Sequence, residues 1–204
     1  YSLTNGVTVP ANVELIFHSS VVVINAAGMW AFDSSGTVRG LKLQGNGNVT
    51  TRLMRFNKDS KTYDLTLQHT AVGDMSAKGL FDLTMSSNIV IDGVKIKNLS
   101  FTSAGESLYY IDCASDVVIR NHIEEDLVRA FNDSNAHFNV RGAKGLIVEN
   151  STIRANSEVL SYGNLSGSIT SGEAVTQTLF RYNTLYLYSW SSQVSGGVFQ
   201  LERG

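Results

Sequence analysis

Apolar residues along this chain come in short runs, and the same arrangement of runs returns about every thirty residues. Each repeat has an apolar stretch, a break at a small or Asn-like residue, and then a second apolar pair. The segments that share this form are TVRGLKLQG (37–45), TYDLTLQHT (62–70), NIVIDGVKIKN (88–98), DVVIRNHIEED (116–126), GLIVENSTIRAN (145–156) and TLFRYNTLYLYS (178–189). No window of a dozen residues holds a clear helical period. The pattern predicts short β-strands rather than helices.

The repeat predicts a stacked architecture. Equivalent positions lie 24 to 32 residues apart when the segments are aligned on Leu43, Leu67, Ile96, Ile123, Ile153 and Leu185. Such a period is typical of solenoids, in which each rung hydrogen-bonds to its neighbours and buries alternate side chains. A β-sandwich also has short strands, but its pattern does not return at a near-constant period. We therefore expect an all-β, right-handed, single-stranded parallel β-helix of about seven rungs, forming one domain over residues 1–204.

The break inside each repeat predicts a tight bend between two strands. The residues at this break are Gly40, Gly93, Asn121 and Asn150. Gly and Asn tolerate left-handed backbone angles better than other residues do, so they suit a sharp change of direction.

Composition and charge exclude several classes of function. The chain has 16 basic and 18 acidic residues, a net charge of −2 and a pI of about 6.1, so it lacks the electrostatic footprint of a nucleic-acid-binding protein. No apolar run approaches the roughly 18 residues of a membrane-spanning helix, so membrane insertion is not expected. One cysteine and four dispersed histidines give no metal-ligand spacing, and we expect neither a metal nor a cofactor. The start, YSLTNGV, has no initiator Met and no signal segment, which suggests a piece of a longer chain.

Several segments resemble one known family. GVTVPANVELIF (6–17), followed by SSVVVI (19–24), is similar to the opening rung of a pectate-lyase-like right-handed parallel β-helix, and VVIRN (117–121) and LIVENSTIRAN (146–156) resemble its interior rungs. The resemblance is specific for fold rather than for function. The family includes pectin-degrading lyases and hydrolases, polysaccharide epimerases, adhesins and bacteriophage tailspikes. The VPANVELIF entry, the absence of disulfides and the ends of the chain favour the tailspike or appendage branch, which implies a homotrimer on the virion tail.

An acidic run interrupts the repeat at one rung. VVIRNHIEEDLVRAF (117–131) begins like a buried strand and then places three carboxylates in succession, Glu124, Glu125 and Asp126. With Ile123 facing the core, Glu124 would face outward in a column with Lys97 and Arg154. One interpretation is an exposed ion-pair ladder, in which each pair contributes only ~0–1 kcal/mol.

The same carboxylates also have the spacing of a glycan-cleaving site. Glu124 and Asp126 would share one face of a strand, about 6.6 Å apart. An inverting glycoside hydrolase needs one protonated and one ionised carboxyl group, roughly 6.5–9.5 Å apart. Crowding raises the proton affinity of at least one acid, as a general acid requires. Glu124 and Asp126 are therefore the first candidates for the acid and the base, followed by Glu125, Asp112 and Asp133.

A second register stays open for this rung. Without a one-residue deletion, His122 and Glu124 take the core positions of Val94 and Ile96. Burial of both side chains would require partners and would itself indicate a functional site. We favour Ile123 inward because that keeps the core apolar.

Basic and aromatic residues supply candidate contacts to a glycan. Aromatic rings can stack on sugar faces, and a cation beside a base could stabilise the enolate that a lyase forms. The candidate substrate-binding residues are Lys97, Arg120, Arg129, His137, Arg154, Tyr186 and Trp190.

These features predict a protein that binds a bacterial surface polysaccharide along its flank and cleaves it by acid/base hydrolysis. A polymer with phosphodiester links also fits. Two alternatives stay open: a secreted pectate-lyase-like polysaccharide lyase, and a non-catalytic adhesin or virion spike in which the charges form only a ladder. The expected location is the virion tail, or the extracellular medium for a secreted lyase.

Overall fold

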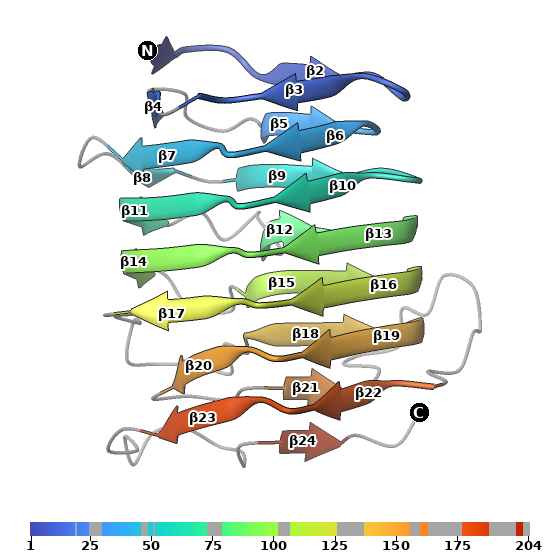
Figure 1. Cartoon of the computed structure of the whole chain (residues 1–204). Helices are drawn as coiled ribbons and strands as arrows, with labels where there is room; N and C mark the ends of the chain where they lie inside the picture. The colour runs from blue at the N-terminus through green and yellow to red at the C-terminus, as the bar shows by residue number, and fades with distance from the viewer. Residues whose placement is uncertain are drawn as a thin grey trace.

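The chain winds into a parallel β-solenoid with three sheets (Figure 1). The computed structural model describes residues 1–18, 20–24, 30–45, 49–50, 52–72, 79–101, 107–125, 137–155, 160–162, 177–187 and 199–201. All regular elements in these ranges are strands, and no helix there is long and apolar enough to cross a membrane. The predicted fold class, an all-β parallel β-helix, is confirmed.

The three sheets, which we name A, B and C, hold nine, eight and seven strands. Sheet A contains β1 (Ser2–Leu3), β4 (Val21–Ile24), β7 (Lys42–Gly45), β8 (Val49–Thr50), β11 (Thr66–Val72), β14 (Lys95–Phe101), β17 (Ile123–Glu125), β20 (Thr152–Ala155) and β23 (Thr184–Leu187). Sheet B contains β2 (Val7–Val9), β5 (Trp30–Ser34), β9 (Arg52–Phe56), β12 (Gly79–Asp82), β15 (Ser107–Asp112), β18 (Phe138–Arg141), β21 (Leu160–Tyr162) and β24 (Phe199–Leu201). Sheet C contains β3 (Glu14–Ile16), β6 (Thr37–Arg39), β10 (Lys61–Tyr63), β13 (Ser87–Asp92), β16 (Ser115–Arg120), β19 (Lys144–Glu149) and β22 (Leu179–Arg181).

The strands pair in parallel throughout the described residues. The chain passes repeatedly through B, C and A, so that each strand lies on the corresponding strand of the preceding rung. Parallel pairing with connections this short is possible because each rung returns to the same sheet only after visiting the other two.

The bend from sheet C to sheet A is built by one residue per rung with a positive φ. These residues are Gly40 (69°), Asp64 (55°), Gly93 (77°), Asn121 (55°), Asn150 (53°) and Tyr182 (56°). The four bend residues expected from the repeat are therefore confirmed as left-handed positions. Small and amide side chains suit this conformation, whereas a tyrosine there is unusual.

The bend sets which side chains face the interior. Residues one and three positions after each bend are buried in the middle rungs: Leu41 and Leu43, Leu65 and Leu67, Val94 and Ile96, His122 and Glu124, Ser151 and Ile153. The pairing places Glu124 beside Ile96 and Glu125 beside Lys97. The expectation that Ile123 faces the core was therefore wrong, and the alternative register is the one that the structure adopts. The equal spacing from bend to strand in every rung excludes the one-residue deletion.

The core is an apolar column that runs the length of the solenoid. On the sheet B side, aromatic rings stack from rung to rung: Phe81 lies 4.9 Å from Tyr109, and Tyr109 lies 5.0 Å from Phe138, between ring centres. All three side chains are fully buried. Tyr109 is the one ring of these three that carries a hydroxyl. Because this hydroxyl is buried, it needs a polar partner in the interior.

We expect Gly40→Ala to destabilise the solenoid, because Gly40 has a φ of 69° and an added Cβ would lie 2.7 Å from the carbonyl oxygen of Phe17. The left-handed backbone alone costs a non-glycine residue about 1–2 kcal/mol. Urea unfolding measures the loss. Asn150→Gly is the matched control, since glycine suits the same left-handed position, and its stability should stay close to that of the wild type. Equal stability of Gly40→Ala and the wild type would contradict the bend geometry.

Candidate functional site

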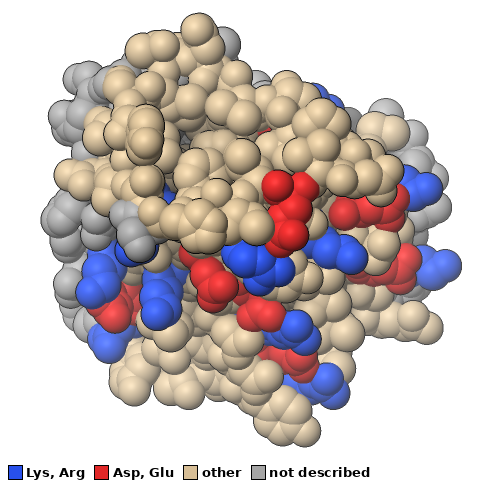
Figure 2. Space-filling view, turned by 45° about the horizontal axis from the view of Figure 1, so that its top comes forward, with Lys and Arg blue, Asp and Glu red and all other residues tan. Residues whose placement is uncertain are grey.

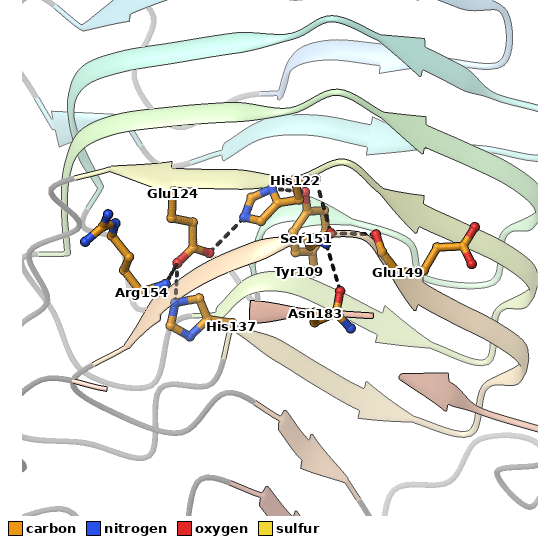
Figure 3. Close-up of polar contacts among 8 residues, drawn as sticks. All are labelled: Tyr109, His122, Glu124, His137, Glu149, Ser151, Arg154 and Asn183. Atoms are coloured by element: carbon orange, nitrogen blue, oxygen red, sulfur yellow. Dashed lines mark hydrogen bonds and ion pairs between the residues drawn. The ribbon is translucent and has the colours of Figure 1, made fainter. Parts of the chain in front are cut away.

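The most unusual feature of the interior is a buried carboxylate between two imidazoles (Figure 3). Oε1 of Glu124 lies 2.8 Å from Nε2 of His122, and Oε2 lies 2.8 Å from Nε2 of His137. The backbone N–H of Arg154 also donates to Oε2 over 3.0 Å. The Glu124, His122 and His137 side chains have no solvent exposure. We call these three residues, together with Tyr109, the interior network.

The network is assembled from three segments of the chain. His122 and Glu124 flank Ile123 at the start of β17, because both follow the bend at inward-facing positions. His137 immediately precedes β18 of sheet B, and Tyr109 comes from the aromatic stack on β15. The hydroxyl of Tyr109 lies 3.1 Å from Nδ1 of His122 and so extends the network across the interior.

Burial and the neighbouring groups shift the pKa values of Glu124 and Tyr109. Burial by itself raises the pKa of Glu124, but the charge of His137 and the hydrogen bonds from both imidazoles outweigh it, so the pKa lies well below its ordinary value of 4.5. The ionised carboxylate accepts from Nε2–H of both histidines. Burial, reinforced by the Glu124 charge, raises the pKa of Tyr109 well above 10.0, so its hydroxyl stays protonated. This hydroxyl lies 3.1 Å from Nδ1 of His122, and the charge of His137 is the strongest of the influences that lower the pKa of Glu124.

A polar column continues from the network toward the last rungs. The backbone N–H of His122 donates to Oγ of Ser151 over 3.1 Å, and this hydroxyl donates to the carbonyl of Glu149. In the next rung, Oδ1 of Asn183 accepts from the backbone N–H of Ser151. His122, Ser151 and Asn183 each follow a bend by one residue, which is the position that Leu41, Leu65 and Val94 occupy in earlier rungs. The polar groups of the column satisfy one another, as buried polar groups must.

Outside the same strands, a second set of polar residues faces solvent. We name Lys97, Glu125, Arg154 and Tyr186 the outer column. Nζ of Lys97 lies 2.6 Å from Oε2 of Glu125, and the hydrogen bond from Lys97 is the largest cause of a lowered pKa at Glu125. The Arg154 guanidinium lies 4.7 Å from the centre of the Tyr186 ring, which is 47% exposed. Of the predicted ion-pair ladder, the pair with Lys97 is present, and its acid is Glu125 in place of Glu124.

Sheet C carries ion pairs of its own on the outer face. Arg120 pairs with Asp92 at 2.8 Å, Arg181 with Glu149 at 2.7 Å, and Arg39 with Glu14 at 3.1 Å. Lys and Arg side chains lie beside Asp and Glu side chains across the face seen in Figure 2. Because the arginine of each pair is more than 40% exposed, each pair stabilises the fold by only ~0–1 kcal/mol.

The other candidates are distributed as follows. Asp112 is half-buried at the end of β15, and its carboxylate accepts hydrogen bonds from the Tyr110 hydroxyl and the Cys113 thiol. His137, predicted as a substrate-binding residue, is enclosed in the interior network. The candidates that lie outside the described residues are Asp126, Arg129, Asp133 and Trp190.

Sequence reasoning missed Tyr109 and treated the inward position of His122 and Glu124 as the less favoured register. One signal could have decided it. The core residue follows its bend by three positions at Gly40, Gly93 and Asn150, and the same count from Asn121 reaches Glu124. No pattern in the sequence connects Tyr109 or His137 with this rung, because both approach it from another sheet.

In the part of the chain that the structure describes, no group of three His, Cys, Asp or Glu side chains is arranged to hold a metal ion. Comparison with family models, curated proteins and solved structures gives no match. The structure itself shows a parallel β-solenoid. The function is therefore inferred from the arrangement of the side chains.

We expect Glu124→Gln to destabilise the fold in a pH-dependent way. At neutral pH the change removes the carboxylate that two buried imidazoles share, at a cost of about 3 kcal/mol or more. Because the folded-state pKa of Glu124 is below 4.5, its contribution is full above that pH and is lost as the pH falls further. The difference in urea unfolding free energy between wild type and variant should therefore shrink between neutral pH and about pH 3.

Glu125→Gln is the matched control, since this neighbouring acid faces solvent and pairs with Lys97. Its loss should be small at every pH. An equal loss in the two variants at neutral pH, or a difference that grows in acid, would contradict the interior network.

Proposed function

We propose that this chain binds an extended bacterial surface polysaccharide along the outer face of sheet A. The observation that carries the proposal is a pair of exposed tyrosines on one rung. Tyr182 is 76% exposed at the bend, and Tyr186 is 47% exposed on β23. Each ring has an arginine guanidinium near it, Arg181 at 5.5 Å and Arg154 at 4.7 Å from the ring centre.

Exposed aromatic rings flanked by cations suit a sugar ligand. The apolar C–H face of a sugar ring can stack on an aromatic ring, while its hydroxyl and acidic groups hydrogen-bond to neighbouring polar side chains. Tyr182 also occupies a left-handed backbone position that a bulky residue rarely adopts. Strain of this kind is often retained where a side chain has a binding role.

The outer column favours a linear polymer over a compact ligand. Lys97, Glu125 and Arg154 come from successive strands and are spaced at ~4.8 Å along the solenoid axis, leading to Tyr186. A long chain lying parallel to the axis meets one polar side chain per rung. This arrangement supports the tailspike-like branch, in which a homotrimer on a virion tail presents such flanks to the host envelope.

Cleavage of the polymer stays a prediction. The Glu124 carboxylate is fully buried and bonded to two imidazoles, which argues against direct protonation of a glycosidic oxygen by Glu124. Its burial favours the second candidate function, a non-catalytic adhesin or virion spike domain. Hydrolysis or elimination would then need acids such as Asp126 or Asp133, which lie outside the described residues.

We expect Tyr186→Ala to weaken polysaccharide binding roughly two- to tenfold, because it removes one stacking ring. A panel of purified bacterial surface polysaccharides, immobilised and titrated with the chain, measures the change. Tyr63→Ala is the matched control: Tyr63 lies on the outer face of sheet C with the Arg39 guanidinium 4.3 Å from its ring centre. Equal effects of the two changes would contradict a binding role for the outer face of sheet A.

A separate assay for reducing ends and unsaturated products tests cleavage. If the chain cuts a polymer that it binds, Asp126→Asn should abolish product release and leave binding unchanged. Glu124→Gln should impair cleavage only to the extent that it unfolds the protein, which circular dichroism on the same sample checks. Loss of cleavage in folded Glu124→Gln would instead restore Glu124 as the leading catalytic candidate.

A further inference from the structure

Beside the outer column, on β14, where Lys95 lies two residues before Lys97, a groove crosses the bend between sheets C and A. Its volume is about 290 Å³, and its lining includes Gly40, Lys42, Asp64, Thr66, Gly93 and Lys95. The pairing places Lys42 and Lys95 on either side of Thr66, on three successive strands. Their backbones are therefore about 10 Å apart, so both long side chains can reach one small group between them.

The charged residues of this groove make few direct contacts. Glu14, Asp92, Glu125 and Glu149 each form an ion pair with an arginine or lysine. Lys42, Asp64 and Lys95 form no ion pair with the described residues, although the charge of Lys95 helps to lower the pKa of Glu125. What sets the groove apart is that it gathers two lysines and a carboxylate around one concavity, where a ligand can contact all three.

The glycines let successive rungs pack closely at the bend that lines the groove. A Cβ at Gly93 would lie 3.1 Å from Oδ1 of Asp64, and a Cβ at Gly40 would lie 2.7 Å from the carbonyl oxygen of Phe17. A larger residue at Gly93 would therefore displace the Asp64 side chain from its place in the lining.

The chemistry of the lining selects a particular kind of ligand. Two lysines attract an anionic group, whereas Asp64 between them repels a bare anion and accepts hydrogen bonds from hydroxyl groups. The Thr66 hydroxyl can donate or accept. A ligand that satisfies all four residues carries one acidic group and adjacent hydroxyls.

We propose that this groove binds an acidic sugar unit, with its carboxylate or phosphate between Lys42 and Lys95 and its hydroxyls on Asp64 and Thr66. The inference deepens the proposed function, because the acidic unit would belong to the polysaccharide that lies on the outer face of sheet A. It makes the bound polymer an anionic one. The outer column supplies stacking, and the groove supplies the preference for charge.

The test has two parts, so that the groove and the polymer are judged separately. The first follows backbone amide shifts of Gly40, Thr66 and Gly93 by NMR during titration with D-glucuronate, glucose 6-phosphate, D-glucose or inorganic phosphate. Saturable shifts are expected with D-glucuronate or with glucose 6-phosphate, and the acidic sugar that gives the larger shifts identifies carboxylate or phosphate as the preferred anion. Equal shifts with glucose or with inorganic phosphate would overturn the proposal.

The second part compares acidic bacterial polysaccharides with their carboxyl-reduced forms. Lys42→Gln and Lys95→Gln should each weaken binding of the acidic form by roughly two- to fivefold and leave the reduced form unaffected. Lys58→Gln, a change at an exposed lysine outside the groove, is the matched control. Polymer binding without any charge preference refutes the groove and keeps the proposed function. Acidic sugars that shift the groove amides, in a chain that binds no polymer, refute the proposed function and keep the groove.

Discussion

The register between rungs is the constraint on which the rest of this structure depends. Each rung turns at a left-handed residue and pairs in parallel with the rungs on both sides, so its side chains have no freedom to choose between interior and exterior. The bend at Asn121 therefore commits His122 and Glu124 to the interior and turns the apolar Ile123 outward. A shift by one residue would restore an apolar core locally. It would also break the backbone hydrogen bonds to the rungs above and below, such as that from Ile123 to Val94.

The interior network is the molecular consequence of that constraint. A lone carboxylate in the core would be very costly, because burial removes its hydration. Here three N–H groups replace the lost water, and the charge of His137 favours the ionised carboxylate. The arrangement is stable only with every partner present, since removal of one leaves the others buried and unsatisfied. Local pattern and global register thus disagree at this rung, and such disagreements tend to mark functional or specificity-determining positions.

Much of the fold could be predicted from the sequence because its information is local and repeated. The bends can be recognised in the sequence from their Gly and Asn residues, Gly40, Gly93, Asn121 and Asn150. The apolar pairs after them return with a near-constant period. The register of β17 was predicted wrongly because hydrophobicity was ranked above the number of residues that separate a core position from its bend. An isoleucine beside a glutamate is normally the better core residue. Burial of Glu124 also depends on His137 and Tyr109, which reach the network from the sheet B side. No local sequence pattern predicts these two contacts.

The alternation of inward and outward side chains also separates stability from recognition in this chain. His122 and Glu124 hold the rung together from within, while Lys97, Glu125 and Arg154 are presented outward by the same strands and by their neighbours. Exposed ion pairs contribute little to folding, so the outward positions can change with the ligand at small cost to the solenoid. Lys42 and Lys95 fit this division, because both are exposed and form no ion pair with the described residues. Their charges are then available to a partner outside the chain, and the bends that fix the register also fix where those charges are presented.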